Sequence, residues 1–520
     1  MVIPFFIGNF LQNLYNRMMN KNGLIICIGL LCVVLSSCRE DRPPNIVYVL
    51  ADDLGIGDVS IYNLDGKIKT PHIDEIATGG MRFTDAHSGS AVCTPTRYGI
   101  LTGRYSWRGS MKSGVTWSYD SSIIERDRMT VASMLQTAGY ETACIGKWHL
   151  GLDWVQDTTG KWPVDFNQKV TNGPLEHGFD YFYGIPASLD IPPYVYVEND
   201  RVTAQPDKET ENTSDYGWWR KGPTGSDFDH ETVLQQFSER SARYIKDHKE
   251  EPFFLYLPLS APHTPILPDA KNKGKSGLSE YGDFVMTVDD VIGNVLAALK
   301  ENGLEENTLI FFASDNGCAP YAGTVEMEKM GHYSSLNYRG YKAEIYEGGH
   351  RIPFMVKWPN QIRPNSVSNE TVCLTDLMAT VAHVLNVNLP DNAGEDSYDI
   401  SPVLIQDKLK SSLREATVHH SMDGSFAIRK DNWKLILTKG TGGWKSEALT
   451  KQLAEAQYPY QLYDLTEDVG EKNNLYEQNQ EKVEELWALL KDYVASGRST
   501  PGKDQPYVKT DQWPGMEWMN

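Results

Sequence analysis

Four residues with oxygen-bearing side chains form two adjacent pairs, each close behind an apolar run: Asp52, Asp53, Asp315 and Asn316. A single Asp-Asp or Asp-Asn-Gly after a strand is usually a turn or a helix cap. Three carboxylates brought together with an amide, however, would repel one another without a cation. An all-oxygen ligand set suits Ca²⁺ or Mg²⁺ better than zinc or copper. The two pairs together therefore predict a site for a divalent cation such as Ca²⁺ or Mg²⁺.

The segment Cys93-Thr94-Pro95-Thr96-Arg97 is a second candidate. Pro95 favours the start of a helix, which would put Cys93 near a helix N-terminus, where the helix dipole favours negative charge. Arg97 follows one helical turn later and can reach the same point. The spacing predicts a nucleophile beside an anion-binding site. The alternative is a buried free cysteine without a chemical role.

Four apolar runs must position these residues, at 45–51, 141–146, 253–259 and 308–313. Helical spacing is found at 130–140 and 283–300. Near-continuous apolar strands that alternate with helices are typical of an α/β fold with a mostly parallel sheet. Polar residues follow every run, including Lys147 and His149 after the second and His263 after the third. Because ligands bind at the carboxyl ends of parallel strands, the four ends predict one shared site.

The pattern changes near residue 400. Short apolar runs separated by turn residues, and then an amphipathic segment, predict a small antiparallel sheet with a helix packed on it. These segments lie at 416–419, 426–429, 433–438 and 474–496. We therefore expect a catalytic domain over residues 41–400 and a C-terminal subdomain over residues 401–520.

The N-terminal region indicates export. Residues 24–35 form an apolar stretch that is too short to span a membrane and is typical of a signal peptide. Leu35-Ser36-Ser37-Cys38 resembles the bacterial lipoprotein box, in which the chain is cut before a cysteine that carries lipid. We expect residues 1–37 to be removed and the lipid on Cys38 to anchor the protein in the bacterial envelope, in the periplasm or on the outer surface. An ordinary secretory signal is the alternative.

Composition excludes several classes of partner. The 520 residues carry a formal net charge of −20, which argues against a nucleic-acid partner. The seven cysteines include no Cys-x-x-Cys pair, so neither a disulfide scaffold nor a zinc or iron–sulfur site is supported. The membrane is expected to be contacted only through the lipid.

Cys-x-Pro-x-Arg followed by Leu101-Thr102-Gly103-Arg104 resembles the signature of the type I sulfatases. Further blocks of that family occur in the same order: 44–47 before Asp52-Asp53, 146–151, 262–263, 314–317, Lys342, 347–353, 462–465 and 471–475. The resemblance covers most of the chain. It implies the alkaline-phosphatase-like fold, a large mixed and mostly parallel sheet sandwiched by helices.

The resemblance also implies roles for individual residues. In that family a maturase oxidises the cysteine that matches Cys93 to Cα-formylglycine, whose hydrate attacks sulfur and also contacts the cation. Arg97 and Lys147 would orient the hydrate, and His149 would be the base that releases the bound sulfate. His263 and Lys342 would face the leaving oxygen, with His263 as the general acid. The predicted pocket is locally positive in an acidic protein.

Substrate residues are predicted on less specific patterns. The loop after residue 187 offers Asp190 for hydrogen bonds to sugar hydroxyls and Tyr194 for stacking, although a proline-rich surface loop would look the same. His177 lies in a family block of mainly structural character, and His350 and Arg351 are candidates for binding a charged neighbouring sugar.

The export signal and the resemblance to lipoprotein sulfatases of gut bacteria predict exo-acting desulfation of galactose or N-acetylgalactosamine in host glycosaminoglycans or mucins. Cleavage at the 6-O position is slightly favoured over the 4-O position. Two alternatives remain open. One is a formylglycine-dependent phosphonate or phosphate monoester hydrolase, and the other is a catalytically dead lipoprotein that binds glycans.

Overall fold

The computed structural model describes residues 42–516 except 406–408, 410, 446, 510–512 and 514. The predicted signal peptide and the lipid-bearing Cys38 lie outside the described residues. Among the described residues, none of the helices is long and apolar enough to cross a membrane. From residue 44 onward, the described residues form one compact unit.

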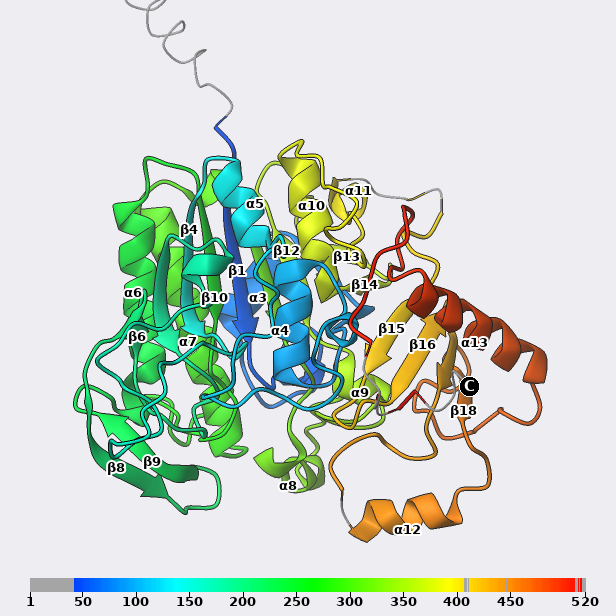
Figure 1. The fold of residues 1–520 in the computed structure, drawn as a ribbon. Helices are drawn as coiled ribbons and strands as arrows, with labels where there is room; N and C mark the ends of the chain where they lie inside the picture. Colours follow the sequence, from blue (N-terminus) through cyan, green and yellow to red (C-terminus); the bar gives the residue numbers. More distant parts are fainter. Residues whose placement is uncertain are drawn as a thin grey trace, which may run out of the picture. The chain divides into compact units, whose positions relative to one another are not determined.

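A ten-stranded sheet lies at the centre of this unit (Figure 1), with the order β13-β2-β12-β11-β1-β10-β4-β5-β6-β7. Its strands are β1 (Asn45–Ala51), β2 (Met81–Phe83), β4 (Glu141–Lys147), β5 (Tyr181–Ile185), β6 (Val197–Glu198), β7 (Arg201–Val202), β10 (Phe253–Pro258), β11 (Thr308–Ser314), β12 (Phe354–Lys357) and β13 (Ser366–Ser368). The run from β11 through β1, β10 and β4 to β5 is parallel throughout. Antiparallel pairs occur only toward the two edges of this sheet, at β11–β12, β12–β2, β5–β6 and β6–β7.

Helices cover both faces of this sheet, which explains why its central strands are apolar throughout. Successive residues of β1 point to opposite faces, and Tyr48 packs in one core whereas Val47 and Val49 pack in the other. The first core contains α4 (Cys93–Thr102), α5 (Val131–Thr137) and α10 (Leu377–Val384), and the second contains α3 (Pro71–Thr78), α6 (Val233–Asp247) and α7 (Glu280–Glu301).

A separate four-stranded antiparallel sheet follows near the C-terminus, with the order β15-β16-β17-β18. Its strands are β15 (Thr417–His420), β16 (Phe426–Lys430), β17 (Trp433–Ile436) and β18 (Gln461–Asp464). Helix α13 (Gln480–Ala495) packs on it, as Figure 1 shows near the red end of the chain. Leu486 and Leu490 of this helix lie in the core that it shares with the sheet. The predicted fold class is thereby confirmed.

Shorter elements complete the fold: β3 (Ala86–His87), β8 (Pro206–Asn212), β9 (Trp219–Gly225), α8 (Thr324–Lys329), α9 (Glu347–His350), β14 (Val372–Cys373), α11 (Ser401–Ile405) and α12 (Glu447–Glu455). Strands β8 and β9 form a hairpin of their own, and β3 pairs with β14.

Candidate functional site

The four predicted strand ends lie side by side. In the order β11, β1, β10 and β4, four neighbouring parallel strands end at the same edge of the sheet. Backbone hydrogen bonds continue past the strands, from Asp52 N to Ala261 O at 2.9 Å and from Asp315 N to Ala51 O at 3.1 Å. The polar residues that follow each strand are therefore held in register at one site, as the sequence predicts.

Three buried carboxylates at this edge are each paired with a buried cation. Lys147 Nζ donates to Asp52 Oδ2 at 2.6 Å. Lys342 Nζ donates to Asp53 Oδ2 at 2.7 Å, and the Arg97 guanidinium donates to Asp315 Oδ2 at 2.8 Å. The formal charges of the three pairs cancel, so a bound dication would leave the site positive and able to attract an anionic ester.

The oxygen atoms left over at this site fit a hard divalent cation. Among the described residues no hydrogen-bond partner exists for Asp52 Oδ1 or Asn316 Oδ1, although both atoms are buried. The Asn316 amide instead donates to Asp53 Oδ1 at 2.7 Å, which directs its own oxygen away. Buried oxygens without a partner are costly, and Ca²⁺ or Mg²⁺ would satisfy them. Asp52, Asp53 and His263 also offer ligand atoms within 4.8 Å of one another.

The electrostatics of the carboxylates follow from these pairings. Burial alone would raise the pKa of Asp52, but Lys147, His263 and Arg97 hold the pKa of Asp52 well below its ordinary value. Burial and the neighbouring charge of Asp52 raise the pKa of Asp315 to about 7. A cation between the two would relieve their mutual repulsion.

Cys93 is the first residue of α4 and is buried. Burial raises the pKa of the Cys93 thiol, and Lys147 and Lys342 offset that effect only in part. The helix N-terminus was expected to favour the thiolate, but burial raises the thiol pKa instead, so an unmodified Cys93 stays protonated. The Arg97 side chain does not direct its donors at Cys93, because its guanidinium donates to Asp315 and, at 3.0 Å, to the carbonyl of Lys147.

The two predicted acid–base histidines have defined tautomers. His149 Nε2 lies 2.8 Å from the carbonyl of Thr116 and must donate to it. Within the described part of the chain nothing pairs with His149 Nδ1, and burial holds the pKa of His149 well below its ordinary value. His149 is therefore a neutral imidazole with one free lone pair, which is the state of a base. Its φ of 55° is unusual for a residue with a side chain.

His263 has the opposite arrangement. Its Nδ1 donates to the carbonyl of Thr264 at 2.6 Å, so Nε2 is the nitrogen that faces the site, 3.7 Å from Asp53 Oδ2. Burial and Lys342 lower the pKa of His263. An anion bound nearby would raise that pKa again and allow Nε2 to hold a proton.

Three further residues contact the predicted site residues and carry no motif of their own. Thr116 fixes the His149 ring. The Ser188 hydroxyl lies 3.4 Å from Lys147 Nζ and 3.3 Å from a ring nitrogen of His263. The Tyr321 hydroxyl lies 3.4 Å from Lys342 Nζ. Single polar residues in loops give no periodic or spacing signal, so only their contacts reveal them.

Of the predicted substrate residues, Asp190 lies at this site. It forms an ion pair with Arg220, and His263 and Arg220 lower its pKa against the effect of burial. Tyr194, by contrast, is buried, donates to the carbonyl of Arg220 at 2.6 Å and packs against His230. Its ring offers no exposed face to a sugar, so the prediction that Tyr194 stacks on a sugar ring is wrong.

His177, a further predicted substrate residue, also does not fit a role in substrate binding. Its ring is buried and stacked on Trp148, with ring centroids 6.3 Å apart, and its Nε2 lies 3.2 Å from the Ser122 hydroxyl. His177 thus packs against the Trp148 ring, which agrees with the structural character of its sequence block.

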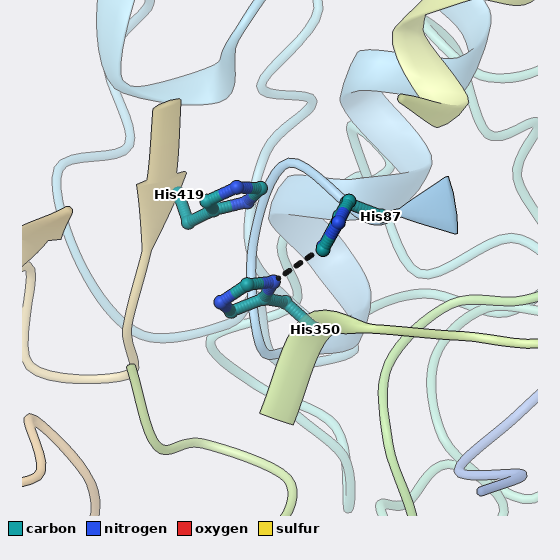
Figure 2. A group of neighbouring side chains, drawn as sticks. All are labelled: His87, His350 and His419. Carbon is teal, nitrogen blue, oxygen red and sulfur yellow. Dashed lines mark hydrogen bonds between the residues drawn. The ribbon is translucent and has the colours of Figure 1, made fainter. Parts of the chain in front are cut away.

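His350 and Arg351 belong to a second buried cluster, at the contact between the large sheet unit and the C-terminal sheet. Arg351 forms ion pairs with Asp85 and Glu347, both at 2.9 Å. His350 packs with His87 of β3 and His419 of β15 (Figure 2). Their polar atoms are engaged in the interior, so the prediction that His350 and Arg351 bind a neighbouring sugar is wrong.

The hydrogen bonds of this cluster connect the two sheets. Lys434 can only donate, so His350 Nε2 accepts from it at 3.0 Å and His350 Nδ1 carries the proton when the ring is neutral. His350 Nδ1 lies 3.0 Å from His87 Nδ1, the dashed line in Figure 2. His87 Nε2 lies 2.8 Å from Asp85 Oδ1 and 3.0 Å from the Arg429 guanidinium, which itself pairs with Asp85.

Three neighbouring histidines raise the question of a metal, but their geometry does not fit one. The rings of His350 and His419 are stacked at 3.8 Å with an angle of 8° between their planes. An imidazole binds a metal in the plane of its ring, and two nearly parallel planes share no nearby point. The cations Lys434 and Arg429, each 3.0 Å from a ring nitrogen, would also repel a metal.

Known proteins resemble this chain along most of its length. A family model described as Sulfatase matches residues 44–387, and one described as N-sulphoglucosamine sulphohydrolase, C-terminal, matches residues 340–498. An N-acetylgalactosamine-6-O-sulfatase of Bacteroides thetaiotaomicron is 36% identical over 490 residues, which cover 87% of this chain and 93% of that protein. Human arylsulfatase A is 31% identical over 464 residues and 86% of each chain.

A solved structure is also similar to this chain. It comes from work on the metabolism of multiple glycosaminoglycans by Bacteroides thetaiotaomicron, is 34% identical to this chain and superposes with a TM-score of 0.76. The match covers 87% of this chain and 99% of the other.

Proposed function

The chain belongs to the sulfatase family and is a sulfuric ester hydrolase, and from this premise we propose that it removes sulfate esters from carbohydrate. The preferred substrate is a 6-O-sulfated galactose or N-acetylgalactosamine unit at the end of a glycan. The observation that carries this proposal is the 36% identity to an N-acetylgalactosamine-6-O-sulfatase, which extends over 93% of that protein. The chain spans the catalytic region and the C-terminal sheet alike.

The geometry supports a division of labour among the residues of the site. Formylglycine formed from Cys93 by a maturase would supply the nucleophile, while a Ca²⁺ held by Asp52, Asp53, Asp315 and Asn316 would neutralise charge on the sulfate. Lys147 and Lys342 place two ammonium groups beside these acids, where sulfate oxygens bind. Arg97 joins Asp315 to the end of β4 and so keeps the strand ends in register.

The histidines divide the proton transfers. His263 presents Nε2 toward Asp53 and Lys342, so it is the group that can hold a proton for the leaving sugar oxygen. His149 presents an unpaired Nδ1 and is neutral, so it is the group that accepts a proton when sulfate is released. The two side chains thus meet the requirements of an acid and a base in one site.

A panel of sulfated sugars tests the proposal. We expect inorganic sulfate to be released from N-acetylgalactosamine 6-sulfate or galactose 6-sulfate faster than from the 4-sulfates, and no release from matched phosphate esters. Faster release of phosphate than of sulfate would identify a phosphoester hydrolase instead. Tight sugar binding without turnover, in protein whose formylglycine is verified by mass, would identify a glycan-binding protein.

A further inference from the structure

Two groups of solvent-exposed aromatic rings flank the candidate active site. Exposed apolar side chains that lie together can mark a ligand-binding groove, and the exposed fractions are 50% for Trp117, 41% for Tyr321 and 40% for Trp444. Each group touches a residue of the site. The backbone of Thr116, next to Trp117, fixes the His149 ring, and the Tyr321 hydroxyl approaches Lys342 Nζ.

The first group is built on Arg220 of β9. Its guanidinium lies over the rings of Trp117 and Trp218, with 5.2 and 4.9 Å to their centroids, and it forms an ion pair with Asp190. Asp190 is almost fully buried, and in the described part of the protein its Oδ1 has no hydrogen-bond partner. Arg220 thus holds a buried carboxylate beside the aromatic rings.

The second group joins the two sheets of the protein. Trp444, from the segment that follows β17, lies against Tyr321 with ring centroids 5.8 Å apart and 48° between the planes. The Tyr321 hydroxyl points inward, toward Lys342 Nζ at 3.4 Å, while much of the residue faces solvent. Asp190 follows two residues after Ser188, whose hydroxyl lies 3.3 Å from a ring nitrogen of His263, and Tyr321 contacts Lys342, so both groups lie next to the candidate site.

We propose that these two groups form the walls of a subsite for the sugar ring that carries the sulfate. Trp117 and the Tyr321–Trp444 pair contact the apolar faces of the pyranose, and the Asp190 carboxylate lies where it can accept a hydrogen bond from a ring hydroxyl. Arg220 is a positioning residue that acts through Asp190. The C-terminal region therefore takes part in substrate recognition through Trp444, which lies between β17 and β18. This inference rests on the proposed carbohydrate substrate.

Binding to a protein that cannot turn over isolates this subsite from catalysis. In full-length Cys93→Ser protein, the affinities for N-acetylgalactosamine 6-sulfate and for inorganic sulfate are measured by calorimetry. We expect Trp444→Ala and Trp117→Ala each to raise the Kd for the sugar sulfate about tenfold, as for loss of one aromatic contact. The Kd for inorganic sulfate should stay within about twofold of its value without the second substitution. Tyr458→Ala is the control, because the contacts of Tyr458 with Tyr476 and Glu477 lie within the C-terminal region.

If the substitutions weakened the binding of both ligands equally, or of neither ligand, the proposed subsite would be wrong. Arg220→Gln, assayed in the active enzyme, should raise KM about tenfold with little change in kcat, whereas a purely structural role would lower the melting temperature and leave KM unchanged. These outcomes are separate from the proposed function, which fails only if the wild-type enzyme with verified formylglycine hydrolyses no sulfated sugar.

Discussion

At the scale of single residues, the hydrogen bonds assign chemistry that the motif leaves open. The same block supplies Lys147 and His149, yet Lys147 is a charged partner of Asp52 whereas His149 is neutral with a free Nδ1. The difference arises because Lys147 faces a carboxylate and His149 faces a backbone carbonyl. A residue's role at this site is therefore decided by its partner.

Replacing His149 by Gln should lower kcat by about 10²–10⁴, the usual contribution of a general base. KM should change little, because His149 is not needed to bind the ester. Steady-state kinetics on the preferred sugar sulfate check this. His177→Gln is the matched control, a buried histidine that packs on Trp148, and it should keep kcat. A full kcat in His149→Gln would remove His149 from catalysis.

The oxygens of Asp52 and Asn316 that have no partner predict a stabilising cation. After chelation, addition of Ca²⁺ at about 100 times its Kd should stabilise the fold by about 2.7 kcal/mol, seen as a rise in melting temperature. Asp52→Asn should abolish that rise. A melting temperature that does not respond to Ca²⁺ or Mg²⁺ in the wild-type protein would contradict the assignment.

At the scale of elements, the contact between the two sheets is built from groups of neutral histidines and paired charges. His87 and His350 come from the large unit, and His419 and Lys434 from the C-terminal sheet. Burial holds the pKa values of His350 and His419 well below the ordinary value and also lowers that of His87. Lys434 bridges Glu347 and Glu471 at 3.1 and 2.9 Å.

Stability should therefore fall in acid. An imidazole kept neutral in the fold takes up a proton on unfolding, so stability is full above about pH 6.5 and is lost as the pH falls below it. Glu471 opposes this, because its pKa is raised to about 7 by burial and it gains protons in the fold. Asp85, Glu347, Arg351 and Arg429 also face the cluster, where Asp85 pairs with both arginines and Glu347 pairs with Arg351 and Lys434.

His419→Phe keeps a flat ring on His350 and removes one titrating group. The loss of unfolding free energy between pH 6 and pH 5 should shrink by about 1.4 kcal/mol per pH unit, the contribution of one proton. Urea unfolding at several pH values measures this slope. His383→Asn, at an exposed histidine, is the control and should not alter it. An unchanged slope in His419→Phe would show that His419 does not titrate on unfolding.

The strongest sequence predictions concerned long apolar strands. The run 308–313 became β11 at Thr308–Ser314, and 253–259 became β10 at Phe253–Pro258. The short edge strands β6, β7 and β13 were missed because two or three residues carry no periodicity. Tyr194 and His350 were misjudged because burial depends on contacts from distant segments, such as His419 against His350, which a local pattern does not contain.

At the scale of the whole molecule, an acidic protein surrounds a site whose charges balance. The chain carries −20 charges, but the three acids of the site are each matched by Lys147, Lys342 or Arg97. Surface charges more than about 8 Å away are largely screened at physiological salt. A bound dication makes the site positive, so the acidic exterior does not exclude a sulfated substrate.

The location of the protein remains a prediction from residues outside the described part. We expect intact-mass analysis of the native protein to find a mature chain that begins at a lipid-modified Cys38. An unmodified N-terminus at another residue would indicate an ordinary secretory signal.

The central claim is that Cys93 drives hydrolysis of a sugar sulfate. Its most direct test is the release of inorganic sulfate from N-acetylgalactosamine 6-sulfate by the wild-type enzyme and by Cys93→Ala, side by side, with formylglycine in the wild type verified by mass. We expect sulfate release by the wild type and none above background by the variant, with both proteins folded. Equal release by the two proteins, or none by the wild type on any sulfated sugar, would contradict the account.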